Sequence, residues 1–390
     1  MEDYIQKYQL EDVLSEVLND CVKSRSDNPF GFMAKALFQK TPSVILNVHA
    51  GYLIEHPGGP TTYVDIRTHK GVFRGIFPRA SNPSIHELPE LRDLDTRFHG
   101  KGVMQAVFTI NEKIAPLLIG KDPRNQADID RLLRVKTKYT NVMYPISVAV
   151  CKAGAKEHDM SVAEYIAHLL HSEPMSPVVH VRPLFRSGHL ELYLGASGEE
   201  CTRKMYETAE SFTPDGSSET DLLIAATRAI EDTGHTGDVW IGIHMNASER
   251  ITETNSYTVS DQMWSREQLI DLYTQWADEF PLMFIEDPFD QDDPMSFTAL
   301  KNAMDSCMVI GTNLYASCPK RVTGPWTHVL TLKPSASGTV SLALECVQRT
   351  KEHDMHLLVS DRSTAFTPDE FDADFAVGAG ARFLRQKFHL

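Results

Sequence analysis

Polar and charged side chains follow several short apolar runs in the second half of this 390-residue sequence. They are His244 after WIGI, Glu286 after LMFI, Thr312 and Asn313 after MVIG, Lys333 after LTL, and Asp361, Arg362 and Ser363 after LLV. A lysine can remove a proton, a carboxylate can hold a cation, and an arginine can bind an anion. If the fold brings them together, these groups predict an anion-binding or proton-abstracting site. Any one of them alone, at the edge of a loop, is more often solvated or salt-bridged.

The apolar runs themselves have the length and composition of buried β-strands. They are VVHVRPLF, DVWIGIHM, PLMFIED, CMVIGTN, HVLTLKPS and MHLLVSD, and they alternate with helical patterns such as residues 219–232 and 266–279. Such alternation predicts an α/β fold with a parallel sheet, and this number of repeats favours a barrel over an open sheet. Active sites of such barrels lie at the ends of the strands, so we expect the polar residues to converge there.

A second kind of pattern precedes the barrel. From residue 43 to residue 77, apolar and polar residues alternate, with breaks at Gly58-Gly59 and Lys70-Gly71, which predicts a three-stranded antiparallel meander. Helical stretches follow at about residues 102–118 and 142–171. We therefore expect an α+β domain over residues 43–172 and the barrel over residues 173–390.

The first 42 residues predict a helical hairpin. Residues 4–23 carry apolar side chains at helical spacing, and Asn28-Pro29 offers a cap and a first-turn proline for a second helix over residues 30–38. Two short helices bury too little apolar surface alone, so they pack on the rest of the chain or on a second copy. We favour self-association as a homodimer. The segment resembles docking and dimerisation hairpins of the RIIα type.

Composition excludes several classes of function. The net charge of −15 disfavours binding to nucleic acid or to an anionic membrane. Six scattered cysteines fit a reducing compartment, since they form neither a zinc motif nor a disulfide scaffold. The acidic N-terminus is unlike a targeting peptide, and no apolar run approaches the ~20 residues that span a bilayer. We expect a cytoplasmic protein.

Longer strings resemble the enolase family, in order, over roughly residues 48–380. The most specific are VAVCKAGA, FIEDPFDQDD and LTLKPSASGTVS. The resemblance implies an α+β capping domain followed by a TIM-like barrel, here shortened, because few residues follow Arg385. It also implies the chemistry established for the enolase superfamily, in which a base removes a carbon-bound proton while one or two magnesium ions stabilise the enediolate.

Carried over position by position, the resemblance divides the site into retained and lost residues. Lys333 matches the base, Glu286 matches one metal-binding acid of three, and Arg362 and Ser363 match the phosphate-contacting pair. The positions that depart from the family are Asn82 and the loop at His189 in the two closing loops, Ala209 or Glu210 for the general acid, His244, Thr312 and Asn313 for metal acids, Asp361 for a histidine, and Arg385 for a lysine.

These departures predict a protein without enolase catalysis. An imidazole and a hydroxyl are poor substitutes for carboxylates on magnesium, so no cofactor is expected, except magnesium if activity remains. An enolase-like protein with such a hairpin resembles flagellar enolase-like proteins, which implies a structural role in a cilium or flagellum with axonemal or microtubule-associated partners. The alternatives are an active phosphopyruvate hydratase, converting 2-phosphoglycerate to phosphoenolpyruvate at a weakened magnesium site, and a phosphometabolite sensor that uses Arg362 and Ser363.

Overall fold

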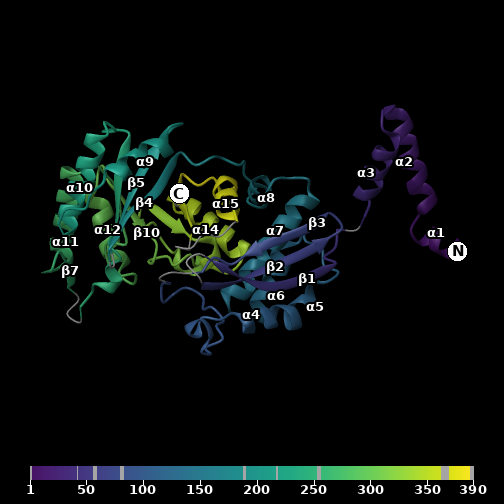
Figure 1. Cartoon of the computed structure of the whole chain (residues 1–390), viewed down its shortest axis with the longest axis horizontal. Coiled ribbons are helices and arrows are strands. Elements are labelled where there is room, and N and C mark those ends of the chain that lie inside the picture. Colours follow the sequence, from purple (N-terminus) through teal and green to yellow (C-terminus); the bar gives the residue numbers. More distant parts are fainter. Residues whose placement is uncertain are drawn as a thin grey trace.

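The computed structural model describes residues 2–41, 43–55, 59–79, 83–187, 190–216, 218–252, 256–361 and 369–386. Along the chain come N-terminal helices, a three-stranded sheet covered by helices, and a closed barrel (Figure 1). The predicted α/β class, with an α+β domain before a barrel, is confirmed. Among the described residues, no helix has both the length and the apolar character needed to cross a bilayer.

The N-terminal helices stand apart from the rest of the chain (Figure 1). They are α1 (Glu2–Lys7), α2 (Leu10–Ser24) and α3 (Pro29–Gln39). Residues 4–23, predicted as one helix, form two, because Gln9 adopts a left-handed conformation with φ of 50° that interrupts the helix. The predicted start of the last helix is confirmed: the Asn28 side chain accepts a hydrogen bond from the Gly31 backbone N–H at 2.9 Å.

The predicted antiparallel meander is confirmed as the sheet of the α+β domain. Its strands pair in the order β1 (Asn47–Glu55), β2 (Gly59–Thr68) and β3 (Gly71–Ile76). Helix α7 (Thr140–Glu157) packs against β2 and β3. A β-carbon on Gly75 would lie 2.1 Å from the carbonyl oxygen of Pro145, so this close approach of strand and helix requires glycine.

The remaining helices of this domain were predicted in part. The stretch at about residues 102–118 contains a π-helical turn, and the stretch at about residues 142–171 is divided where Ser161 caps a new helix. One helix was missed altogether. The elements are η1 (Arg97–Gly100), α4 (Met104–Phe108), η2 (Thr109–Ile114), α5 (Ala115–Leu118), the missed α6 (Gln126–Lys136), and α8 (Val162–Leu169) after α7.

The barrel is closed by eight strands of this chain. In chain order they are β4 (Val179–Ser187), β5 (Leu190–Ser197), β6 (Val239–His244), β9 (Leu282–Glu286), β10 (Met308–Gly311), β11 (Val329–Leu332), β12 (His356–Ser360) and β13 (Phe383–Arg385). Because β13 pairs with β4, the shortening predicted for the barrel does not reach its wall. Its interior is filled by side chains such as Val181, Tyr193, Phe284 and Phe383.

The sheet of the barrel is not fully parallel, which corrects the prediction from the sequence. Strand β5 runs antiparallel to both β4 and β6. Only two residues separate Ser187 at the end of β4 from Leu190 at the start of β5, and so short a link joins antiparallel neighbours. Strands β5 and β13 were missed, the first because it follows β4 so closely and the second because it has three residues.

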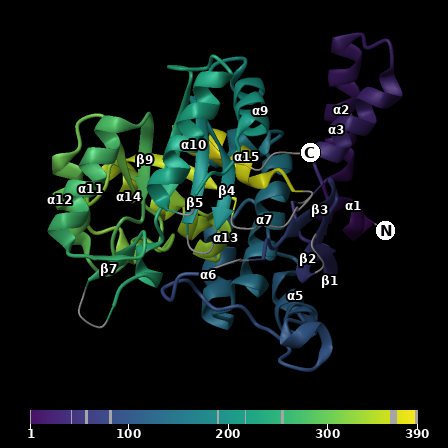
Figure 2. The same cartoon turned by 60° about the vertical axis from the view of Figure 1, so that its left-hand side comes forward.

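Helices surround the barrel, and α10, α11 and α12 lie outside its strands in Figure 2. The helices are α9 (Cys201–Ser211), α10 (Glu219–Asp232), α11 (Arg266–Glu279), α12 (Pro294–Ala303), α13 (Pro334–Ser337), α14 (Val340–Glu352) and α15 (Phe371–Ala379), with short η3 (Ala247–Glu249) and η4 (Pro319–Arg321) and the hairpin β7 (Tyr257–Val259) and β8 (Gln262–Trp264).

Buried polar contacts join the α+β domain to the barrel. The carboxylate of Asp130 on α6 accepts hydrogen bonds from the backbone N–H of Ser341 at 2.9 Å and from its hydroxyl at 2.7 Å. Ser147 on α7 accepts a hydrogen bond from the Val340 backbone N–H at 2.9 Å. These bonds satisfy donors in the first turn of α14, so they hold the two domains in one orientation.

Candidate active site

Several of the predicted residues lie at or just after the ends of the barrel strands. His244 ends β6, Glu286 ends β9 and Arg385 ends β13, while Thr312 and Lys333 follow β10 and β11. Hydrogen bonds and close ion pairs connect the side chains of His244, Glu286, Thr312 and Arg385, together with Asp287. The structure therefore brings most of the described candidates together at one end of the barrel.

Glu286 is fully buried and is paired with Arg385. Nη1 of Arg385 donates to Oε1 of Glu286 at 3.1 Å, and Nη2 donates to Oε2 in a shorter contact. The Thr312 hydroxyl also donates to Oε1. Burial alone would raise the pKa of Glu286, but the positive charges of Arg385 and His244 hold it well below its usual value. Both oxygens of this carboxylate are thus occupied by protein donors.

The Arg385 guanidinium lies in an aromatic setting. Its central carbon is 4.2 Å from the centre of the Tyr193 ring and 5.8 Å from that of Phe284. Burial would lower the pKa of Arg385, but the charge of Glu286 raises it above its usual value. Arginine can stack its planar guanidinium on a ring and at the same time donate two hydrogen bonds to one carboxylate. Lysine cannot provide this geometry.

Asp287 anchors the turn that follows β10. Its Oδ1 accepts the backbone N–H of Thr312 at 2.8 Å, and its Oδ2 accepts that of Asn313 at 3.0 Å. Asn313 also donates from its amide to the side-chain oxygen of Asn246 at 3.1 Å. Asp287 itself has a left-handed φ of 44°, which lets its side chain turn back onto these amides. Its oxygens are therefore committed to local structure.

His244 is held as a cation. Its Nε2 lies 3.3 Å from Oδ2 of Asp287, and its Nδ1 lies 3.8 Å from Oε2 of Glu191. Burial would lower the pKa of His244, but the negative charges of Glu286, Asp287 and Glu191 raise it to about 10. Burial would raise the pKa of Glu191, but the nearby His244 imidazole holds it below its usual value. At neutral pH the imidazole is protonated and cannot donate a lone pair to a metal.

These contacts decide whether magnesium fits. His244, Glu286 and Asp287 each offer one atom within 4.8 Å of the others, and no other such group occurs in the described part of the chain. Magnesium requires several oxygen ligands in near-octahedral geometry. Here the carboxylate oxygens already accept hydrogen bonds from Arg385, Thr312 and backbone amides, and the imidazole is protonated. The residues present do not fit a magnesium ion, because two protein cations occupy the place of the metal charge.

The other predicted residues contribute less. Lys333 is half-buried, and its backbone N–H donates to the Ser317 hydroxyl at 2.9 Å, while no described residue accepts a hydrogen bond from its ammonium group. Asp361 follows β12 and accepts a hydrogen bond from Ser360 through its backbone carbonyl at 3.1 Å. Ala209 is half-buried and Glu210 is exposed in the last turn of α9. Outside the described residues lie Asn82, His189, Arg362 and Ser363.

Three residues of the site were missed in the sequence. Asp287 follows Glu286 directly, so the search for polar residues at the ends of predicted strands could have included it. Glu191 and Tyr193 alternate on β5, where the Tyr193 hydroxyl donates to Glu191, but this strand was not predicted. A search for period-two alternation in LELYLGAS would have found both.

Comparison with known proteins gives consistent matches over most of the chain. Residues 45–166 match the family model of the enolase N-terminal domain, and residues 203–386 match that of the enolase C-terminal TIM barrel domain. An enolase from Eimeria tenella is 31% identical over 398 residues, with 86% of this chain and 89% of the relative covered. Cytosolic enolase 3 from Arabidopsis thaliana is 30% identical over 437 residues, with 99% and 92% covered.

Proposed function

Because this chain belongs to the enolase family, we propose that it is a non-catalytic, enolase-like protein with a structural or scaffolding role. The observation that carries the proposal is the buried pair in which Arg385 occupies both oxygens of Glu286. Glu286 is the one family metal acid that this chain keeps, so the pair takes the last strong magnesium ligand out of use.

The charges of the site support the same conclusion. In the family reaction, metal ions lower the energy of a negatively charged enediolate. Here the fixed cations, Arg385 and protonated His244, face Glu286, Asp287 and Glu191 instead, so their charges are already compensated within the protein. Lys333 keeps the position of the base. A base that lacks both the metal ions and a positioned general acid has no driving force for the proton transfer.

The proposal predicts that magnesium does not bind at the barrel mouth. A site whose Kd is a hundredth of the magnesium concentration would stabilise the fold by about 2.7 kcal/mol, whereas we expect a change below about 0.5 kcal/mol. The measurement is urea unfolding with and without magnesium chloride at constant ionic strength, beside isothermal titration calorimetry. Glu286→Gln serves as the matched control and should respond as the wild type does. A Glu286-dependent stabilisation of several kcal/mol would overturn the proposal.

For the N-terminal helices we propose self-association into a homodimer. Helix α2 has two apolar stripes. The first consists of Val17 and Cys21, which are buried inside the hairpin. The second stripe consists of Leu14, Leu18 and Val22, which are 53%, 53% and 68% exposed at helical spacing. Since the hairpin stands apart from the barrel and from the sheet, a second copy of the same stripe is the partner that would cover it (Figure 1).

Charges placed in this stripe should therefore convert the dimer into a monomer. We expect Leu14→Glu/Leu18→Glu to halve the mass measured by light scattering after size-exclusion chromatography, because like charges would face each other across the interface. Ser15→Glu/Asn19→Glu is the matched control, with the same charges and spacing on an exposed polar face, and should remain dimeric. A dimer that survives the first variant would place the interface on another surface.

As the location we propose a cilium or flagellum, with axonemal or microtubule-associated proteins as partners. The support is the likeness of the N-terminal segment to docking hairpins, since a scaffold needs a contact surface outside its folded body. The match to the Arabidopsis thaliana relative extends over 99% of this chain, so much of the hairpin segment is shared with a relative named as cytosolic. Proximity labelling in ciliated cells would test the location, and recovery of glycolytic enzymes alone would contradict it.

A further inference from the structure

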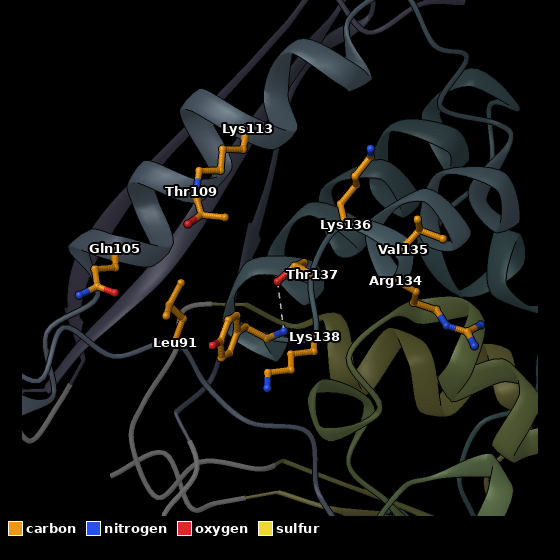
Figure 3. Close-up of a pocket in the computed structure, with 10 residues that line it drawn as sticks. Leu91, Gln105, Thr109, Lys113, Arg134, Val135, Lys136, Thr137 and Lys138 are labelled. Atoms are coloured by element: carbon orange, nitrogen blue, oxygen red, sulfur yellow. Dashed lines mark hydrogen bonds between the residues drawn. The ribbon is translucent and has the colours of Figure 1, made fainter.

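Two adjoining pockets lie beside the junction of α6 and α7. The first has a volume of about 610 Å³, and its lining includes Lys113, Arg134, Lys136 and Lys138 (Figure 3). The second has a volume of about 510 Å³ and extends toward the barrel, where Lys320 joins its lining. Arg134, Thr137 and Lys138 belong to both, so the pockets form one continuous surface, here called the basic groove.

The basic groove contrasts with the charge of the whole protein. The chain has 53 acidic and 38 basic side chains, yet every charged residue that lines the first pocket is basic. In the second pocket the acidic side chain is Glu345, which forms an ion pair with Arg349 at 3.0 Å. The net charge of the surface is therefore positive on a strongly acidic protein.

No single local element explains why these basic side chains gather in one groove. Arg134 and Lys136 lie in the last turn of α6, where the helix dipole favours positive charge. Lys113 comes from η2, Lys138 from the link between α6 and α7, and Lys320 from η4, so no single helix end explains their convergence. Within the described ranges, none of these five side chains forms an ion pair with an acidic residue. Their charges are available to a ligand.

The lining also has an apolar part. Val135, which is 76% exposed, lines the first pocket together with Tyr139 and Leu91, and Leu88 and Met143 line the second. Figure 3 shows Lys113 on the helix opposite Lys138, while the Arg134 side chain points away from both. Cations spread in this way over two pockets do not converge on one small anion. They suit an extended chain that carries several negative charges and some apolar side chains.

We propose that the basic groove is a docking surface for an extended acidic segment of a partner protein. Such a segment would place carboxylates on the lysines and Arg134, and its apolar side chains on Val135 and Tyr139. A nucleic acid fits less well, because a long polyanion would also be repelled by the net negative charge of the protein. This inference does not depend on the state of the barrel site, so each can fail without the other.

The test uses full-length protein and a fluorescent twelve-residue peptide in which glutamate alternates with leucine. We expect saturable binding that weakens at least tenfold in Lys138→Glu/Lys320→Glu. The matched control is Lys121→Glu/Lys351→Glu, which changes the net charge equally at exposed lysines outside both pockets, and which should bind within about twofold of the wild type. Raising salt from 50 to 200 mM should weaken binding, since the contacts are exposed ion pairs.

Three outcomes would overturn the inference. Equal loss of binding in both double variants would show that only net charge matters. Complete displacement of the peptide by millimolar inorganic phosphate would identify a small-anion site. Tighter binding of a twelve-nucleotide single-stranded DNA than of the peptide, lost in Lys138→Glu/Lys320→Glu, would identify a nucleic-acid surface.

Discussion

Purified protein supplied with magnesium and 2-phosphoglycerate should form phosphoenolpyruvate at least about 10⁴-fold more slowly than a magnesium-dependent member of the family assayed beside it. A missing general acid alone costs a factor of about 10² to 10⁴. Loss of the metal ions removes several kcal/mol of transition-state stabilisation, and each ~1.4 kcal/mol is a further tenfold. The pairing of Glu286 with Arg385 is the physical reason to expect the loss of the metal ions.

The control for this rate is Lys333→Ala. Lys333 is the proposed base, so residual family chemistry would disappear in this variant, whereas the activity of a contaminating enzyme would remain. We expect the small background rate to be the same in both proteins. A wild-type rate within a hundredfold of the reference enzyme, abolished by Lys333→Ala, would contradict the proposed function and would establish an active phosphopyruvate hydratase.

Replacing Arg385 by methionine should cost about 3–5 kcal/mol of unfolding free energy at pH 7, because it leaves the Glu286 carboxylate buried without its main partner. Glu286 is 0% exposed, so water cannot replace the guanidinium. The measurement is equilibrium urea unfolding followed by tryptophan fluorescence. All four tryptophans, Trp240, Trp264, Trp276 and Trp326, lie in the barrel half of the chain, so the signal reports on the affected part.

Two further variants make this prediction specific. Arg382→Met removes an exposed arginine three residues earlier that contacts His356, and should cost less than about 1 kcal/mol. Arg385→Met/Glu286→Gln removes both charges and should recover about half of the loss, because no carboxylate is then left unpaired. If Arg385→Met lowered the unfolding free energy no more than Arg382→Met does, the proposed buried pair of Glu286 and Arg385 would be contradicted.

Local patterns in the sequence were sufficient for most of the fold. Alternation with a period of two predicted the meander, and alternating apolar runs and helical patterns predicted the barrel with its polar residues at the strand ends. The features that the sequence did not predict depend on only a few residues each. Gln9 interrupts a continuous helical pattern through one backbone conformation, and β13 is too short to show a period. The direction of β5 follows from a two-residue link rather than from any pattern within the strand.

The sequence by itself determined which chemical groups stand at this end of the barrel: Glu286, His244, Thr312 and Lys333 lie at or just after the ends of their strands whatever the details of packing. Only the tertiary structure decided how these groups are used. Arg385 lies 99 positions from Glu286, and barrel closure makes them a buried pair. The charge of His244 depends on three carboxylates, from β5, from β9 and from the residue after β9, and no local pattern contains their distances. The ends of strands follow from local periodicity. The ion pairs that side chains form, and whether an imidazole is protonated, depend instead on all charged groups within a few ångströms.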